Sequence, residues 1–337
     1  MNYEKFLDLK YCNYIKGIAA LCVMLSHYTQ EPSVFVNGFK IINFFFPGNL
    51  WVAVFFFYSG YGLSYSYIHK ENYLDSFISK KTFNIYIPFA IASFSHTFLL
   101  GIINKSINWI DLLLCCIGIK LTNGVLWYVV ELLVICLLFY ADKKIFKGKD
   151  TVVLWLSIYA IFMIFSFIND IGTHWYISTF AVLLGMFYKK YEKYVLIILS
   201  RVSQFMFNCL IITSFLLIYI IKCIISFNQI SILSIKHTYI ITALNIILAP
   251  LFVLFISVIT SLIKNKNKKN IVLTFLGSIS YEIYLWHMFT FLLSSVIIHN
   301  YYSQIGISIV STILLSYCIS TAKNVLKSKR PIHSKLK

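Results

Sequence analysis

The chain has 337 residues, of which 59% are hydrophobic and 12% are charged, and its mean hydropathy is +0.80. Soluble domains are nearer half apolar and a quarter charged, and transmembrane barrels show short alternating segments, so the sequence excludes both and predicts a polytopic helical membrane protein. The formal net charge of +17 does not indicate a nucleic-acid partner, because the Lys residues cluster in short loops between apolar runs, where positive charge orients helices toward the cytoplasm.

The apolar runs predict an all-α bundle of about ten transmembrane helices, since each run is close to the length that crosses a bilayer. The predicted spans are 13–30, 48–68, 82–104, 124–141, 151–168, 174–189, 205–226, 238–263, 273–298 and 304–324. The apolar segment 107–120 is too short to span, and we expect a re-entrant or interfacial helix there. The spans form one integral-membrane domain over residues 1–337, with a basic cytoplasmic tail at 325–337.

Positive charge alternates from loop to loop along the predicted bundle. Lys residues gather in every second connection and in the tail, at 69–81, 142–150, 189–193, 264–269 and 323–337. The alternate connections hold only Lys40, Lys105, Lys120 and Lys236. Because positive residues favour the cytoplasmic side, ten spans with both termini in the cytoplasm satisfy this preference at each loop. We therefore expect a multi-pass protein of the cytoplasmic membrane.

Lys16 and His27 stand out as ionisable residues inside the first span. Eleven residues of helix rotate about 1100° and rise about 16 Å, so the two side chains share a face, with His27 about half a bilayer from Lys16. Ionisable groups at such depth are costly and usually face a protein interior or a water-filled cavity. The alternative is that Lys16 snorkels to the membrane surface and His27 only packs.

Other ionisable residues lie at a depth similar to that of His27. The predicted topology places His96, Glu131 and His287 at mid to outer depth, which predicts a polar cavity if their helices are adjacent. A lone buried His is more often structural. A His in such a cavity suits a general base, and Glu131 would orient its ring or raise its basicity. A metal site is the rival, but the sequence has no helix-spaced His pair, so we expect no metal.

The second span carries Ser59-Gly60-Tyr61-Gly62 near its middle. Small residues permit close helix approach, so packing is one interpretation of this segment. The other is that Ser59 lines the cavity, although a Ser nucleophile would need a base within reach.

Four segments together resemble the acyltransferase-3 family of bacterial membrane acyltransferases, which O-acylate surface glycans. The first span is similar to the family's opening signature: a basic residue, Gly-Ile-Ala-Ala-Leu at 17–21, and His27 after ten intervening residues. The segment 56–61 resembles its Phe-Phe-x-x-Ser-Gly-Phe motif, 126–128 its Leu-Trp-Phe motif, and 277–287 its late Ser-Tyr-x-x-Tyr-Leu-x-His motif. The resemblance covers nearly the whole chain in the expected order.

The resemblance implies an acyl donor, usually acetyl-CoA, that arrives from the cytoplasm, and a sugar hydroxyl as acceptor. His27 would be the catalytic histidine, and Lys16 would hold the donor. Lys16 stands where the family usually has Arg, so planar bidentate binding of phosphate is lost. The family's Arg-x-x-Arg pair at the third span matches Lys81 and Asn84 here. Lys81 is therefore a second candidate contact to the donor phosphates.

These residues predict a membrane O-acyltransferase, most simply an O-acetyltransferase acting on a surface polysaccharide or a lipid-linked glycan. No cofactor is expected to be bound permanently, and the partners would be the acyl-CoA, the glycan, the bilayer and proteins of polysaccharide biosynthesis. Candidate residues for the substrate cavity are Ser59, His96, Trp127, Tyr284 and His287. The alternatives are a glycan or small-acid transporter that relays protons through the buried groups, and a glycan polymerase subunit.

Overall fold

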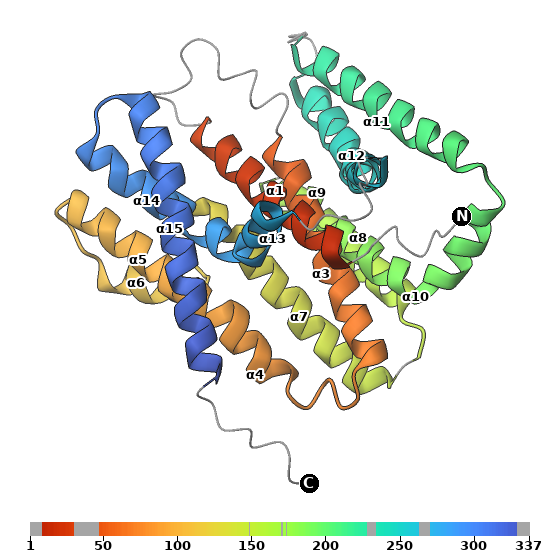
Figure 1. Ribbon diagram of the computed structural model, residues 1–337, viewed down its shortest axis with the longest axis horizontal. Coiled ribbons are helices and arrows are strands. Elements are labelled where there is room, and N and C mark those ends of the chain that lie inside the picture. The colour runs from red at the N-terminus through yellow and green to blue at the C-terminus, as the bar shows by residue number, and fades with distance from the viewer. Residues whose placement is uncertain are drawn as a thin grey trace.

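The computed structural model describes residues 9–29, 47–147, 149–169, 171–172, 174–227, 234–262 and 270–328. Every regular element within these ranges is a helix, which confirms the all-α prediction (Figure 1). In chain order they are α1 (Leu9–Tyr28), α3 (Gly48–His69), α4 (Phe77–Lys81), η3 (Thr82–Tyr86), α5 (Ile87–Ile103), α6 (Trp109–Cys116), η4 (Gly124–Leu126), α7 (Trp127–Phe146), α8 (Val152–Ile168), α9 (His174–Ile177), α10 (Phe180–Ser200), α11 (Gln204–Phe227), α12 (Ser234–Leu262), α13 (Ile271–Ser278), α14 (Ser280–Ile297) and α15 (Tyr301–Ser328).

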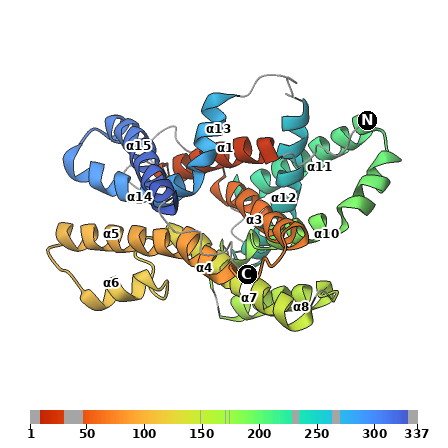
Figure 2. The same cartoon turned by 60° about the horizontal axis from the view of Figure 1, so that its bottom comes forward.

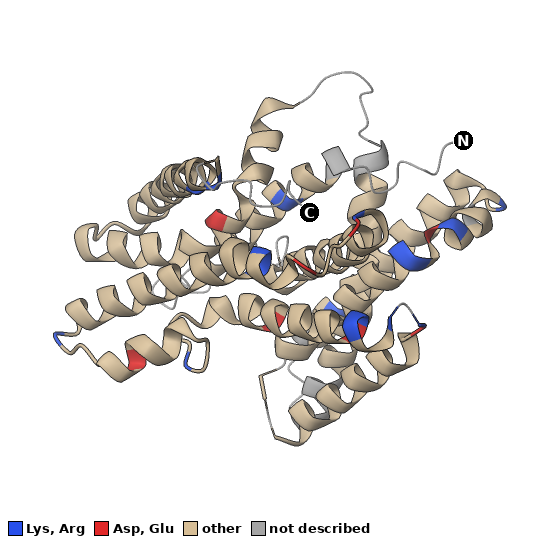
Figure 3. Cartoon of the chain, turned by 90° about the horizontal axis from the view of Figure 1, so that it is seen from below, with Lys and Arg blue, Asp and Glu red and all other residues tan. Residues whose placement is uncertain are grey.

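Several of these helices have the length and composition of membrane spans. Within the described ranges, five are long and apolar enough to cross a bilayer: Phe77–Ile103, Gly124–Phe146, Gln204–Ile225, Ile240–Ile259 and Tyr301–Ser328. Val152–Ile168 is a shorter apolar helix. The chain is therefore a multi-pass membrane protein, while the count of ten spans and the cytoplasmic termini stay predictions. Figure 3 shows how few charged residues interrupt the helices.

The segment predicted as a loop at 189–193 is helical, because α10 runs without a break through it to Ser200. Lys189 pairs with Glu192 one turn later on the same helix, and Lys190 Nζ lies 2.8 Å from Asp150 Oδ1 in the connection before α8. Such i,i+3 pairs support helical structure outside the apolar stretch. The prediction of a loop was wrong because the fall in hydropathy marks the end of the apolar stretch and not the end of the helix.

The predicted span 273–298 consists of two helices, since the backbone breaks at Ile279 between α13 and α14. Helix α13 packs directly on α1. This approach requires glycine, because a Cβ on Gly17 would lie 2.8 Å from the backbone nitrogen of Gly277. The close contact brings the start of α14 to the part of α1 that carries Lys16.

Helices α3 and α10 form another close pair that depends on glycine. A Cβ on Gly60 would collide with the carbonyl group of Val182, and one on Gly185 with the carbonyl group of Phe57. Gly62 has nothing within 4 Å of its Cβ position. The packing interpretation of the segment after Ser59 therefore holds for Gly60.

The segment 107–120 contains the short helix α6, which begins after Asn108, whose side chain accepts hydrogen bonds from the backbone N–H groups of Ile110 and Asp111. At about 1.5 Å per residue, α6 is far shorter than a bilayer is thick. It packs against α5, and Figure 2 shows the two helices side by side. The prediction that this segment does not span is supported, while its depth in the membrane stays a prediction.

Helices α1, α5, α14 and α15, which carry Lys16, His27, His96, His287 and Lys323, are neighbours in the structure. Helix α1 packs on α14, and α14 packs on both α5 and α15. Helix α4 and the C-terminal ends of α3, α7 and α15 lie together at the bottom of Figure 1. The Lys residues near these ends therefore gather at one end of the molecule.

Candidate active site

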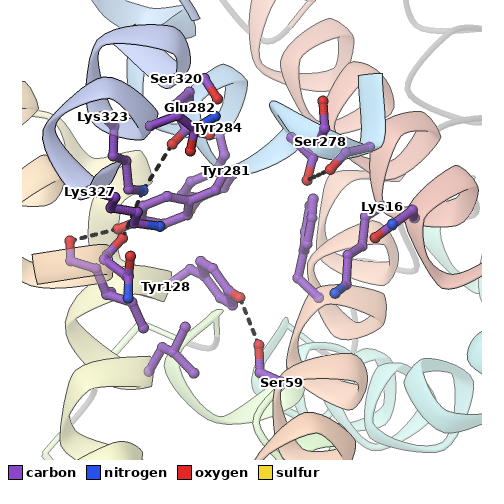
Figure 4. Close-up of a pocket in the computed structure, with 18 residues that line it drawn as sticks. Lys16, Ser59, Tyr128, Ser278, Tyr281, Glu282, Tyr284, Ser320, Lys323 and Lys327 are labelled. Atoms are coloured by element: carbon purple, nitrogen blue, oxygen red, sulfur yellow. Dashed lines mark hydrogen bonds and ion pairs between the residues drawn. The ribbon is translucent and has the colours of Figure 1, made fainter. Parts of the chain in front are cut away.

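A cavity of about 420 Å³, which we call the basic cavity, lies between α1, α3, η3, α7, α13, α14 and α15 (Figure 4). Its cations are Lys16 on α1 and Lys323 and Lys327 on α15, and its carboxylate is Glu282 on α14. Figure 4 shows Lys16 on the opposite side of the cavity from Lys323 and Lys327. Since three of the described lining residues are Lys and one is Glu, this part of the lining carries an excess of positive charge.

Lys323 is held by two partners at the edge of the basic cavity. Its Nζ lies 3.1 Å from Oε1 of Glu282 and 3.2 Å from the carbonyl oxygen of Asn84. Glu282 is 4% exposed, so this ion pair compensates a buried charge. Sequence reasoning placed Lys323 and Lys327 only in a basic stretch near the end of the chain. Their i,i+4 spacing with each other is the signal that they share one helix face.

The two positions that match the family's Arg-x-x-Arg pair point to different places. Asn84 lines the basic cavity, donates from Nδ2 to the carbonyl oxygen of Lys80 at 2.8 Å, and has a buried Oδ1 with no hydrogen-bond partner. Lys81 is not among the residues that line the cavity, and its Nζ lies 5.3 Å from the centre of the Phe77 ring. In this geometry Asn84 therefore reaches the basic cavity, while Lys81 lies against the Phe77 ring of its own helix and beside Cys136 of α7.

An aromatic cluster of Phe55, Tyr128 and Tyr284, which we call the aromatic wall, lines the basic cavity. The ring centres of Tyr128 and Tyr284 are 5.2 Å apart, and Phe55 lies 6.0 Å from Tyr128 and 6.2 Å from Tyr284. The Tyr284 hydroxyl donates to the carbonyl oxygen of Val125, and Ser59 Oγ lies 3.3 Å from the Tyr128 hydroxyl. Ser59 and Tyr284 thus line a cavity as predicted, but on the side of Lys16.

A second cavity, of about 740 Å³, lies beyond the aromatic wall, and we call it the histidine cavity. Its lining includes His27, His96, Trp127 and His174. Val125, whose carbonyl oxygen holds Tyr284, also lines it, so the Tyr284–Val125 hydrogen bond lies between the two cavities. Of the four ionisable residues predicted to share a cavity, the structure brings His27 and His96 together here, while His287 and Glu131 are not among the lining residues. Trp127, a candidate for the substrate cavity, also lines it, and His174 is an addition that the sequence did not indicate.

The ring of His287 packs against the ring of His27. The two imidazole rings stack with centres 5.5 Å apart and planes 25° apart, and the His287 ring is also 5.9 Å from that of Tyr284. His287 Nδ1 lies 2.8 Å from the carbonyl oxygen of Tyr284, which assigns the ring proton to Nδ1 and leaves Nε2 as an acceptor. His287 is 1% exposed, and its Nε2 is buried without a hydrogen-bond partner.

His96 and His174 reach the histidine cavity from two further elements. His96 on α5 is 7% exposed, and its Nδ1 is buried without a hydrogen-bond partner. His174 begins α9, and its ring meets that of Trp127 edge-on at 5.2 Å. Depth along a predicted span offered a signal for His96. For His174, at the start of a span, the adjacent Trp175 is the feature that sets it apart in the sequence.

Glu131, expected to orient His27, lies in a separate apolar cavity of about 190 Å³ between α7, α8, α9 and α10. Its Oε1 accepts a hydrogen bond from Thr179 Oγ1, and its Oε2 is buried without a partner. Glu131 is not among the residues that line the histidine cavity. The structure therefore does not bring Glu131 to His27, and the ring that contacts His27 is that of His287.

Comparison with known proteins identifies one family. The acyltransferase-3 family model, described as an acyltransferase domain, matches residues 9–321, which is nearly the whole chain and includes every residue of both cavities except Lys323, Asn324 and Lys327. A search among curated proteins and one among solved structures returned no match.

Proposed function

The chain belongs to the acyltransferase-3 family, and from this premise we propose that it moves an acetyl group from acetyl-CoA to a hydroxyl of a surface polysaccharide or its lipid-linked precursor. The observation that supports this most is that one set of helices, α1, α7, α14 and α15, contributes residues to both a basic cavity and a histidine cavity. A transferase that joins a phosphate-rich donor to a neutral acceptor needs two such environments around one reacting centre.

The basic cavity is the proposed entry for the donor. Acetyl-CoA carries several phosphate charges at one end and its thioester at the end of a long arm. Lys16, Lys323 and Lys327 would bind the phosphates as point charges, since Lys lacks the planar fork of Arg. The buried Oδ1 of Asn84 would accept a hydrogen bond from the donor. With about 16 Å of helix between Lys16 and His27, a long-armed donor can keep its phosphates at one residue and its thioester at the other.

His27 is the proposed general base. It would take the proton of the acceptor hydroxyl while the hydroxyl oxygen attacks the thioester carbonyl carbon. The tetrahedral intermediate would then collapse, the C–S bond would break, and the proton on His27 would return to the leaving thiolate. The products would be the acetyl ester of the acceptor and free CoA. His287, stacked on His27, would hold the ring in place as a neutral neighbour.

The proposed orientation places the basic cavity at the cytoplasmic side. The Lys-rich ends of α3, α7 and α15 lie with α4 at the bottom of Figure 1, and clustering of Lys at one end is the pattern expected on the cytoplasmic side. The histidine cavity would then face the outer half of the membrane. Acetyl-CoA from the cytoplasm and a glycan outside would meet at the aromatic wall.

The test is transfer by the purified protein in lipid nanodiscs. Acetyl-CoA labelled in the acetyl group is added together with surface glycan from cells that lack the gene. Label recovered as a base-labile ester on the glycan, in step with release of CoA, is the expected result. If the glycan gains no label and CoA release equals that of empty nanodiscs, the protein is not an acetyl-CoA-dependent O-acyltransferase.

A further inference from the structure

A third cavity, of about 400 Å³, shares His27, Trp127 and His174 with the histidine cavity. From these three side chains the two cavities extend in different directions. The histidine cavity runs between α5, α14 and α15, where Leu100, Leu292 and Gln304 line it. The third cavity runs toward α3 and α12, where Asn49 and Asn245 line it, and we call it the asparagine cavity. His27 therefore lies where two separate spaces meet.

The chemistry of the two spaces is similar and differs from that of the basic cavity. None of the described residues that line either space is Asp, Glu, Lys or Arg. Each space offers neutral hydrogen-bonding groups, from Ser295 and Gln304 on one side and from Asn49 and Asn245 on the other. Asn49 Nδ2 lies 3.4 Å from Asn245 Oδ1, so the two amides already face each other. Neutral donors and acceptors on both sides suit the hydroxyls of uncharged sugars.

The shared boundary is aromatic. The ring of Trp127 meets that of His174 at 5.2 Å with planes 63° apart, so the two rings form a corner beside His27. Aromatic faces pack well against the apolar faces of sugar rings, while ring nitrogens bind the hydroxyls at the edge. A sugar ring seated on this corner would present a hydroxyl to His27.

We infer that the acceptor is an internal residue of a neutral glycan chain, with one flanking part of the chain in the histidine cavity and the other in the asparagine cavity. This inference rests on the proposed O-acyltransferase function and narrows its substrate. A chain end would fill one space and leave the other without contacts. An internal residue fills both, so each flanking sugar adds binding surface on its own side of His27.

The consequence is a dependence of KM on acceptor length. A single sugar contacts the Trp127–His174 corner alone. Extension toward one side fills one cavity, and extension toward both sides fills the second. Acceptor KM should therefore fall in two steps as residues are added, and the ester should appear on residues that have a neighbour on both sides. Each step that adds one or two hydrogen bonds to neutral groups lowers KM by about tenfold.

The experiment uses a ladder of one to eight sugar residues, prepared by partial hydrolysis of the surface polysaccharide from cells that lack the gene. The full-length protein in nanodiscs acetylates each fragment, and tandem mass spectrometry locates the ester. Esters on internal residues, with KM falling as length grows in both directions, are the expected result. Esters confined to the terminal residue, or equal KM for one sugar and for eight, would overturn the inference while leaving acyl transfer intact.

Two variants, one in each cavity, test whether both cavities bind the flanking parts of the glycan. Asn245→Leu removes the amide from the asparagine cavity at similar volume, and Ser295→Leu fills part of the histidine cavity at an exposed position. Each should raise KM for the longest fragments about tenfold and leave the single-sugar KM unchanged. Equal effects on both fragments, or none, would contradict two-sided binding. Absence of transfer to every fragment, with no CoA release, would instead reject the proposed function itself and the inference with it.

Discussion

The imidazole rings of His27 and His287 stack with their centres 5.5 Å apart. The two residues are far apart in the sequence, since Tyr28, which follows His27 directly, is 259 positions from His287. The contact is fixed from both sides. Tyr28 donates from its hydroxyl to the carbonyl oxygen of His287 at 2.9 Å, and His287 Nδ1 faces the carbonyl oxygen of Tyr284 at 2.8 Å. The two helices that carry the rings, α1 and α14, are therefore held in register at the proposed reacting centre.

This contact predicts that His287 positions His27 by its shape. His287→Phe retains a ring against His27 and should keep most of the turnover. His287→Ala removes the ring, and misplacement of a catalytic group by about 1 Å can cost a hundredfold, so kcat should fall about ten- to a hundredfold with donor KM unchanged. The measurement is kcat and KM of both variants, with thermal unfolding as a check on folding. Equal inactivity of the two variants would show that Nε2 of His287 takes part in the chemistry.

Lys16 should serve the donor through its charge. Lys16→Ala should raise the KM for acetyl-CoA about ten- to a hundredfold, because a hydrogen bond to a charged group contributes about 1.5–3 kcal/mol. Lys16→Arg keeps the charge and should keep the activity. Lys120→Ala is the control, since Lys120 pairs with Asp111 outside the cavity. An unchanged donor KM in Lys16→Ala would mean that Lys16 only snorkels.

Variants of Lys323 and Lys327 should separate an effect on the stability of the fold from an effect on donor binding. Lys327 is exposed and lines the cavity, so Lys327→Ala should raise the donor KM without changing the unfolding temperature. Lys323→Ala should also destabilise the fold, by about 3–5 kcal/mol, because it leaves the buried Glu282 unpaired. Adding Glu282→Gln to Lys323→Ala should restore most of that stability. Unfolding in detergent measures this cycle, and a double variant no more stable than Lys323→Ala would show that the pair is not the cause.

Gly60 and Gly62 provide a matched pair on α3. Gly60→Ala should lower the yield of folded protein and its unfolding temperature, because the new methyl group collides with the backbone of α10 at Val182. Gly62→Ala should be neutral or slightly stabilising, since the space around Gly62 is open and Ala favours helix. Size-exclusion profiles and unfolding curves of the two variants test this. Similar behaviour of both would contradict the close packing of α3 on α10.

Helical periodicity was sufficient to predict much of the site. The face shared by Lys16 and His27 follows from eleven residues of one helix and needs no tertiary contact. The loop charges and the motif order likewise anticipated an all-α membrane acyltransferase. The structure adds that Lys16 and His27 line two different cavities, because the aromatic wall with Tyr284 lies between them.

The contacts that the sequence did not predict correctly share one physical reason. Depth along a span gives a position across the membrane and says nothing of which helices are neighbours. Glu131 was expected near His27 from its depth, but its side of α7 packs toward Thr179. His287 reaches His27 because α14 packs on α1, and Lys323 reaches the basic cavity because α15 packs on α14. Such neighbours are set by long-range packing, which a single sequence does not reveal.

The most direct test of the account is a single-turnover assay of His27→Ala. The purified variant in nanodiscs is mixed with excess glycan and limiting labelled acetyl-CoA, beside the wild type and His69→Ala, a His variant at the exposed end of α3. Loss of a general base predicts ester formation slower by about 10²–10⁴-fold in His27→Ala, with unchanged unfolding temperature and acetyl-CoA binding, and a normal rate in His69→Ala. A folded His27→Ala protein that forms ester at more than about a tenth of the wild-type rate would contradict the assignment of His27 as the base.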